Sequence, residues 1–455
     1  MHIFFYIHAW HHLQNIEPVI REMERRNVGY TILIFVPRDD NYPRVERLFP
    51  AERIKIFAES RAFRIGERLS VMGKAGKLLG LLWSFLWLLA YFARRRPSRL
   101  VVTEDTTLWS NLLIGVSRLL RVKRVHLPNE NIIFVDGVME DRCRQGQVWP
   151  EHPDWLHRLA RRLYPVNVQP YQGKLLYWYG AHRLIASYFL GLLPATPWVR
   201  GSNHIDCVAV NSRVQFEENA RYGLDAARQA ITGFPMHDQL AACLPQRDSI
   251  KARILEQVGQ PLAALHPIER GQEGEVKICL IIGTVPRFLW TENELPAAYI
   301  AHGEMLRALH EALGDGWRIL VKVHPREDRE AFIEKVGAKD MAYVSFLKTE
   351  FSVYELMAAS DLVIMFKSST VIAAFALDVP VLAYGIHSLH GMAEFYDRYP
   401  SIDQVYSLDE MRARIKKMGD TASLDELKRR RAQDREQYGM FDGKNTERVV
   451  ETILR

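Results

Sequence analysis

The residues best suited to chemistry in the C-terminal half follow two buried, β-rich runs. Residues 319–323 form the first run, which stops at His324-Pro325, and residues 362–365 form the second. Proline ends the first strand because it has no N–H for the ladder. In open parallel sheets, ligands bind beyond the carboxyl ends of the strands. We therefore predict a binding site that contains His324 and the polar residues after the second run, Lys367, Ser368, Ser369 and Thr370.

The chemistry of these side chains suits a phosphate. A helical pattern begins directly after Thr370, and a helix N-terminus attracts anions through its N–H groups and its dipole. The hydroxyls add hydrogen-bond donors and Lys367 adds a positive charge. The alternative is that residues 368–370 merely cap the helix, as serine and threonine commonly do.

A third strand end adds to this predicted phosphate site. Residues 277–282 end at Gly283-Thr284, and Arg287 follows shortly after. Glycine lets a ligand approach the backbone closely, because it carries no side chain. An arginine guanidinium donates paired hydrogen bonds to phosphate oxygens. We therefore place Gly283, Thr284 and Arg287 among the candidate donor-phosphate residues.

In the N-terminal half, a histidine cluster follows a predicted strand at residues 3–7. His8, His11 and His12 precede an amphipathic helix or stand in its first turn. A histidine can act as a general base because its pKa lies near neutrality. We predict His12 for this role, with His8 as the second candidate. The cluster has no nearby acidic partner, so no metal site is expected, and the alternative is that these are ordinary polar loop residues.

Carboxylates after two later strands are further candidates for the base. Residues 100–103 end at Glu104-Asp105, and residues 124–127 lead into Glu130. We include Asp105 and Glu130 because a carboxylate at a strand end could deprotonate an acceptor hydroxyl. Each is also a plausible N-cap or turn residue.

Strands and helices alternate along most of the chain, which predicts an α/β fold with parallel sheets. The first strand, the amphipathic helix and a strand at 30–36 open a doubly wound domain. A chain of 455 residues is too long for one ordinary core. Gly233-Phe234-Pro235 reads as a domain joint. We therefore predict domains at 1–235 and 236–455, with the last helices packing back on the N-terminal domain.

Composition narrows the range of partners. The net charge of +6 and the pI of about 9.0 suit anionic partners such as nucleotides or a phospholipid surface. The excess is too small to indicate nucleic acid, and no nucleic-acid motif is present. The four cysteines make no CxxC pair and no G-x-G-x-x-G follows the first strand, so neither zinc nor a dinucleotide cofactor is expected. The absence of a secretory signal predicts a cytoplasmic protein.

One apolar segment raises the question of membrane contact. Residues 78–93 are apolar apart from Ser84, include two tryptophans and are flanked by basic residues. These 16 residues would form a helix of about 24 Å, shorter than the roughly 30 Å hydrocarbon core. Two interpretations stay open, a helix in the membrane interface and a helix buried in the domain. We expect peripheral contact with the cytoplasmic face of the inner membrane.

Together, these motifs resemble the GT-B glycosyltransferases of bacterial surface polysaccharide synthesis. The similarity is with CDP-glycerol glycerophosphotransferase-like proteins, bacterial polysialyltransferases and capsule Kdo transferases. It extends from about residue 206 to the C-terminus, whereas the first 200 residues share only the architecture. The segments that carry it are VNS at 210–212, TGFPMHD at 232–238, KVHP at 322–325, KSSTVIAAFALDVPVLAYG at 367–385 and FDGKNTERVVETI at 441–453.

The resemblance implies two Rossmann-like domains that face a cleft, with the catalytic base in the N-terminal domain. It also implies that His324, Ser368 and Ser369 bind the phosphates of a nucleotide donor, with Thr370 and the Gly283-Thr284 turn beside them. Two departures stand out. Many GT-B proteins have a ribose-binding glutamate early in the helix after the serine loop, where this chain has Ala373 and Ala374. The acidic motif of polysialyltransferases is not evident, so that assignment is not supported.

We therefore predict a GT-B glycosyltransferase of cell-envelope or capsule synthesis that needs neither a metal nor a cofactor. It would move a sugar from a nucleotide-sugar donor onto a surface polysaccharide or a lipid-linked acceptor. Three alternatives remain: an alditol-phosphate transferase that uses a CDP-alditol, a nucleotide-sugar 2-epimerase, and a non-catalytic scaffold of a polysaccharide assembly complex. The sequence does not identify the nucleobase, the sugar or the acceptor.

Overall fold

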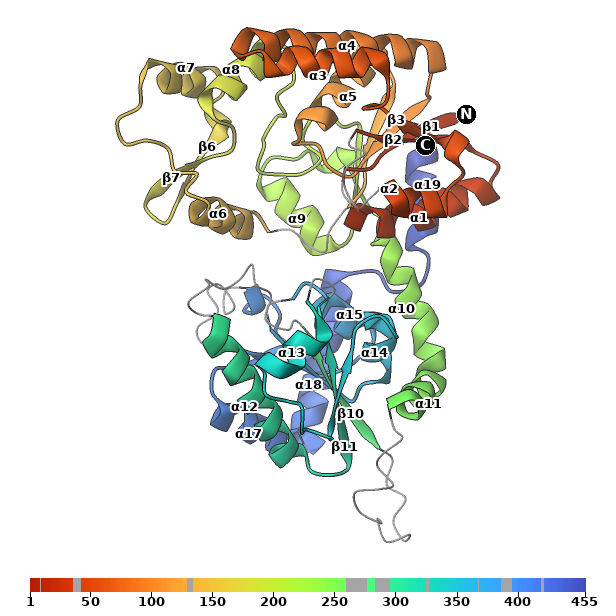
Figure 1. The fold of residues 1–455 in the computed structure, drawn as a ribbon, viewed down its shortest axis with the longest axis vertical. Coiled ribbons are helices and arrows are strands. Elements are labelled where there is room, and N and C mark those ends of the chain that lie inside the picture. The colour runs from red at the N-terminus through yellow and green to blue at the C-terminus, as the bar shows by residue number, and fades with distance from the viewer. Residues whose placement is uncertain are drawn as a thin grey trace. The chain divides into compact units, whose positions relative to one another are not determined.

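The computed structural model describes residues 1–8, 10–35, 42–128, 134–258, 276–282, 295–324, 327–366, 368–385, 395–418 and 421–455. The chain divides into two compact units (Figure 1). Unit 1 comprises Met1–Met236 and Lys444–Arg455, and unit 2 comprises His237–Gly443. Each unit is built on its own parallel sheet, so the predicted α/β class with two doubly wound sheets is confirmed.

The sheet of unit 1 has seven strands in the order β3-β2-β1-β4-β5-β8-β9, all paired in parallel. The order reverses between β1 and β4, and Tyr6 at the end of β1 pairs with Val102 at the end of β4. The carboxyl ends of these two strands therefore lie side by side. The strands are β1 (His2–Tyr6), β2 (Gly29–Ile34), β3 (Ile54–Ile56), β4 (Arg99–Val102), β5 (Lys123–His126), β8 (Cys207–Val210) and β9 (Gln229–Ile231).

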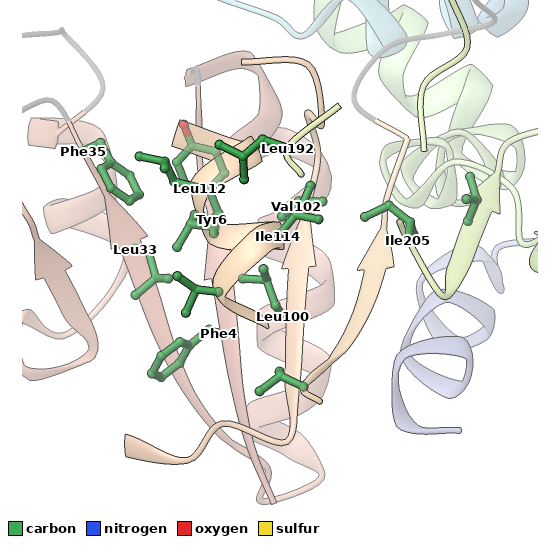
Figure 2. Close-up of a cluster of buried hydrophobic side chains, with 14 of the residues drawn as sticks. Phe4, Tyr6, Leu33, Phe35, Leu100, Val102, Leu112, Ile114, Leu192 and Ile205 are labelled. Atoms are coloured by element: carbon green, nitrogen blue, oxygen red, sulfur yellow. The ribbon is translucent and has the colours of Figure 1, made fainter. Parts of the chain in front are cut away.

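Alternating side chains of β1 enter two hydrophobic cores on opposite faces of this sheet. Ile3 and Phe5 pack with α1 (Trp10–Arg25) and α19 (Asn445–Leu454). Phe4 and Tyr6 enter the other core, where α5 (Leu108–Leu119) contributes Leu112 and Ile114 (Figure 2). The predicted apolar face of the first helix is confirmed, because Ile16, Val19, Ile20 and Met23 are all fully buried. Two further helices of this unit are α2 (Tyr42–Leu48) and α9 (Arg213–Arg221).

The apolar segment forms α4 (Lys74–Arg95), which packs against α3 (Arg61–Val71). The two helices touch closely at Gly80, where an added Cβ would lie 2.3 Å from the Gly66 carbonyl oxygen. The expected length was too short: α4 has 22 residues, about 33 Å, because lysine and arginine extend the helix beyond its apolar run. By length and composition, Ala75–Arg95 is long enough and apolar enough to cross a membrane.

A small helix-and-hairpin region in unit 1 was not predicted. Its two short strands pair antiparallel and belong to no larger sheet. They escape sequence reasoning because each has only four residues and Pro170 interrupts the β pattern of the first. The elements are α6 (Val135–Arg144), α7 (Trp155–Leu163), β6 (Val168–Tyr171), β7 (Lys174–Tyr177) and α8 (Ala181–Phe189).

The sheet of unit 2 has six parallel strands in the order β12-β11-β10-β13-β14-β15. They are β10 (Lys277–Ile282), β11 (Trp317–Lys322), β12 (Val344–Leu347), β13 (Leu362–Met365), β14 (Val381–Tyr384) and β15 (Asp403–Val405). The bounds predicted for β10 and β13 are confirmed, whereas β12 and β15 were not predicted. The helices are α10 (Asp238–Cys243), α11 (Arg247–Val258), α12 (Leu295–Leu313), α13 (Arg329–Lys335), α14 (Val353–Ala359), α15 (Val371–Ala376), α17 (Leu408–Lys417) and α18 (Thr421–Tyr438).

Candidate functional site

Three neighbouring strands of unit 2 end at the same edge of the sheet. Ile282 at the end of β10 pairs with Lys322 of β11 on one side and with Met365 of β13 on the other. His324 follows β11 and Ser368 follows β13 within three residues. The structure therefore brings His324 and the serine–threonine loop to one edge. Lys367, Gly283, Thr284 and Arg287 lie outside the described residues.

The hydroxyls of Ser368 and Thr370 bond to each other rather than to the helix that follows. Ser368 Oγ lies 2.7 Å from Thr370 Oγ1 and accepts the Thr370 N–H at 3.4 Å. Thr370 is the N-cap of α15, yet its side chain makes no capping hydrogen bond. Ser368 and Thr370 are half-buried, and Ser369 is exposed. This geometry argues against simple capping, because the hydroxyls are arranged as a pair at the surface.

The chain after β11 is held by a hydrogen bond between His324 and Glu327 and by a half-buried lysine. The carbonyl of His324 accepts the N–H of Glu327 at 2.9 Å, and the imidazole is half-buried. Lys322 Nζ donates to the carbonyls of Lys348 at 2.6 Å and of Phe351 at 2.7 Å. Burial lowers the pKa of Lys322. Lys322 thus ties the end of β11 to the segment that follows β12, and His324 comes two residues later in the chain.

A tyrosine that sequence reasoning missed completes this edge. Ser368 donates its N–H to the hydroxyl of Tyr396 at 3.1 Å, and Tyr396 donates to the carbonyl of Phe366. No pattern in the sequence marks this tyrosine, because it follows β14 in the chain and reaches β13 only through the fold.

In unit 1, the adjacent ends of β1 and β4 bring His12 to Thr103. His12 Nδ1 lies 2.7 Å from Thr103 Oγ1, and both side chains are buried. The ring of His8 is exposed and its centroid lies 6.1 Å from that of His12. His8 Nδ1 lies 3.2 Å from the hydroxyl of Tyr6, whose pKa is raised by burial. Thr103 was not predicted as a site residue, because nothing in the sequence shows that β1 and β4 are neighbours.

The two carboxylates after β4 hold loops together. Asp105 is fully buried, its Oδ2 accepts the N–H of Asn203 at 3.0 Å, and its carbonyl accepts the Asn203 amide. Burial raises the pKa of Asp105 to about 6. Glu104 pairs with Arg200 and accepts the N–H of Thr106 at 2.9 Å. This geometry favours the turn-residue interpretation of Asp105, whereas Glu130 lies outside the described residues.

The comparison with known families rests on the C-terminal part of the chain. Residues 199–455, more than half of the sequence, match the family described as CDP-Glycerol:Poly(glycerophosphate) glycerophosphotransferase. The chain belongs to this family. The match contains the predicted phosphate edge and the whole of unit 2. No curated protein matches the chain by sequence.

Solved structures show the same architecture at low sequence identity. UDP-GlcNAc 2-epimerase from Neisseria meningitidis, solved with UDP-GlcNAc, is 12% identical with a TM-score of 0.57, and all of both chains is covered. The glycotransferase of kitacinnamycin is 14% identical with a TM-score of 0.53 and 99% of each chain covered. Acinetobacter baumannii MurG is 10% identical with a TM-score of 0.51, with 100% of this chain and 99% of MurG covered.

These likenesses confirm the GT-B fold but do not choose among reactions, because epimerases and transferases share it. The family match makes the choice: the chain is a transferase, in agreement with the predicted glycosyltransferase class. A role in surface polysaccharide synthesis agrees with the same match.

The missing ribose glutamate has a structural explanation. Every residue of α15 is buried, and Ala373 and Ala374 are 1% and 0% exposed. A carboxylate at either position would enter the core, where an unpaired charge is strongly unfavourable. Neither position could therefore present a carboxylate to a bound ribose.

Proposed function

We propose that this enzyme transfers a sugar from a nucleotide-sugar donor onto a cell-surface polysaccharide or a lipid-linked acceptor. The observation that supports this most is the shared edge of β10, β11 and β13. His324 and the paired hydroxyls of Ser368 and Thr370 follow the two strands that flank β10 at that edge. Hydroxyl and imidazole N–H groups are donors, and donors at one edge suit the oxygens of a diphosphate.

The proposed mechanism places leaving-group stabilisation in unit 2. As the bond between the sugar and the diphosphate breaks, negative charge develops on the phosphate oxygens. Donors that are already fixed stabilise this charge without reorganisation. The turn at Glu327 and the hydroxyl pair supply this rigidity for His324 and for the loop.

The proposed base is His12, oriented by Thr103. When Nδ1–H donates to Thr103 Oγ1, Nε2 carries the lone pair that accepts a proton from the acceptor hydroxyl. A fixed partner on one imidazole nitrogen is the usual way in which a histidine base is oriented. His8 is exposed and its ring centroid lies 6.1 Å from that of His12, and it remains the second candidate.

The family name gives the alternative reaction specific support. A CDP-alditol would be cleaved between its two phosphorus atoms, so the acceptor gains an alditol phosphate and CMP leaves. A UDP-sugar would be cleaved at the anomeric carbon, so UDP leaves. Both donors present a diphosphate to the same edge, which is why the residues alone do not separate them.

The test combines nucleotide binding with donor turnover. CMP, CDP, UDP and GDP are each screened by thermal shift against the wild type and His324→Ala. One nucleotide should raise the melting temperature of the wild type only, since a ligand of the folded state stabilises by mass action. His310→Ala is the matched control, because this histidine stacks on Tyr343 just before β12 begins. Incubation with CDP-glycerol or UDP-sugars then separates the two reactions.

Other outcomes decide among the remaining alternatives. Turnover of UDP-N-acetylglucosamine without any acceptor would indicate the epimerase. If no nucleotide shifted the wild type, the catalytic proposal would be abandoned in favour of the scaffold.

We further propose that unit 1 binds the cytoplasmic face of the inner membrane through α4. Leu88 and Phe92 of this helix are fully buried, whereas Leu79 and Leu86 are 54% and 51% exposed. One face of the helix is thus packed into the core of unit 1, and the other face is an exposed apolar strip. The arginines at 94–96, in the last turn of α4 and directly after it, are exposed. Apolar side chains with basic flanks suit an anionic lipid surface.

The helices α7 and α8 carry a second patch of the same character. Trp155 and Phe189 are 67% and 75% exposed, and α7 presents three exposed arginines at 158, 161 and 162. α7 and α8 pack on each other, so these side chains belong to one small region. The ribbon shows this region and the α3–α4 pair along the upper side of unit 1 (Figure 1). A lipid-linked acceptor would then be reached from the membrane surface.

A further inference from the structure

The hydroxyl of Tyr396 bridges two backbone groups just after the end of β13. It donates to the carbonyl of Phe366 and accepts the N–H of Ser368 at 3.1 Å. These two peptide groups stand on either side of residue 367. One side-chain oxygen therefore ties the end of β13 to the first described residue of the serine–threonine loop.

The ring that carries this hydroxyl is held firmly. Tyr396 is 0% exposed and lies in an aromatic cluster with Phe395 and Tyr399, at centroid distances of 4.9 and 6.4 Å. Tyr399 in turn contacts Phe375 of α15 at 5.5 Å. The same cluster thus supports the tyrosine and the helix that follows the loop. Burial raises the pKa of Tyr396, so its hydroxyl keeps its proton for the Phe366 carbonyl.

We propose that Tyr396 is a positioning residue for the donor phosphates, acting through the Ser368–Thr370 hydroxyl pair. This inference rests on the function proposed above, in which the loop binds the diphosphate. The bond from Tyr396 holds the backbone N–H of Ser368, the residue whose hydroxyl lies 2.7 Å from that of Thr370. A displacement of about 1 Å in such groups is enough to weaken binding or catalysis severely.

The test is Tyr396→Phe, which removes one oxygen and keeps the ring. CDP and UDP are titrated calorimetrically, and the donor KM and kcat are measured. We expect the Kd of the bound nucleotide and the donor KM to rise about tenfold, with a small change in the melting temperature of the protein without nucleotide. A Tyr396→Phe protein that fails to fold would assign the hydroxyl to global stability and overturn the proposal.

Tyr438→Phe is the matched control. Tyr438 is also buried, its ring lies 4.7 Å from Tyr399, and its hydroxyl donates to the carbonyl of Arg398. It belongs to the same cluster, but its hydroxyl bonds to Arg398 and not to Ser368, so its loss should leave the nucleotide Kd unchanged. An equal loss of affinity in both variants would overturn the proposal.

A double-mutant cycle with Ser368→Ala separates positioning from general packing. If Tyr396 acts through this loop, its effect on the nucleotide Kd should shrink once the Ser368 hydroxyl is gone. Fully additive effects would contradict the proposal. The proposed function and this inference are overturned by different results. No binding of CDP or UDP to the wild type would overturn the proposed function together with this inference, whereas normal binding by Tyr396→Phe would overturn the inference alone.

Discussion

Replacing Asp105 by asparagine tests whether this carboxylate is a structural group or the catalytic base. The side chain is fully buried, and burial raises its pKa from the usual 3.8 to about 6. An acid with a raised folded-state pKa gives stability that is fully present below its unfolded pKa. This stability is lost as the pH rises through the folded value. Asparagine carries no charge at any pH and can still accept the N–H of Asn203.

The magnitude follows from these two pKa values. Between about pH 5 and about pH 7.5, the wild type should lose unfolding free energy on the order of 1 kcal/mol through this group. The Asp105→Asn protein should not show this loss. The difference in stability between variant and wild type should therefore shift in favour of the variant over that interval, by an amount on the order of 1 kcal/mol.

Urea unfolding followed by tryptophan fluorescence measures this difference. The signal reports mainly on unit 1, because eight of the ten tryptophans lie in Met1–Met236. Asp206→Asn is the control, since Arg124 lowers the pKa of Asp206 and its titration falls below this pH interval. A variant-to-wild-type difference that is equal at both pH values would refute the argument from burial.

Activity completes the test. A structural Asp105 predicts that the asparagine variant keeps most of its kcat. Loss of a general base would instead lower kcat by a factor on the order of 10² to 10⁴. A loss of that size in a folded variant would return Asp105 to the list of bases.

Two further predictions concern unit 1. His12→Ala should lower kcat by a factor on the order of 10² or more with little change in donor KM, and Thr103→Val should lower it less, because the valine only releases the imidazole; a larger effect from His8→Ala would exchange the roles of the two histidines. A Leu79→Glu/Leu82→Glu protein should lose binding to vesicles that contain phosphatidylglycerol, and wild-type binding should weaken with added salt. Ile300→Glu, at a 60% exposed position of unit 2, is the control and should bind normally; equal binding by all three proteins in a sedimentation assay would exclude this surface.

The parts of the fold that could be predicted are those with a strong local pattern. The strands β10 and β13 are buried on both faces and read as continuous apolar runs. Their ends are marked by polar residues, so the edge of the sheet that carries the candidate site could be predicted as well, whereas its role in binding phosphate stays a prediction. The β6–β7 hairpin has neither signal, because its residues are only partly buried and Pro170 stands in one strand. The predicted length of α4 was too short because the prediction covered only its apolar residues. Lysine and arginine are good helix formers, and they continue the helix at both ends.

The contacts that tune the candidate site were not predictable, because they depend on strand order. Thr103 reaches His12 only because β4 crosses over to lie beside β1, and Tyr396 reaches Ser368 only because β14 lies beside β13. In each case, the sequence marks the residue at the strand end and leaves its partner unmarked. Serine and histidine at a strand end are reactive groups in many proteins. In the candidate site, His12 bonds to the hydroxyl of Thr103 and Ser368 bonds to the hydroxyl of Tyr396. The strand order brings each of these hydroxyls close.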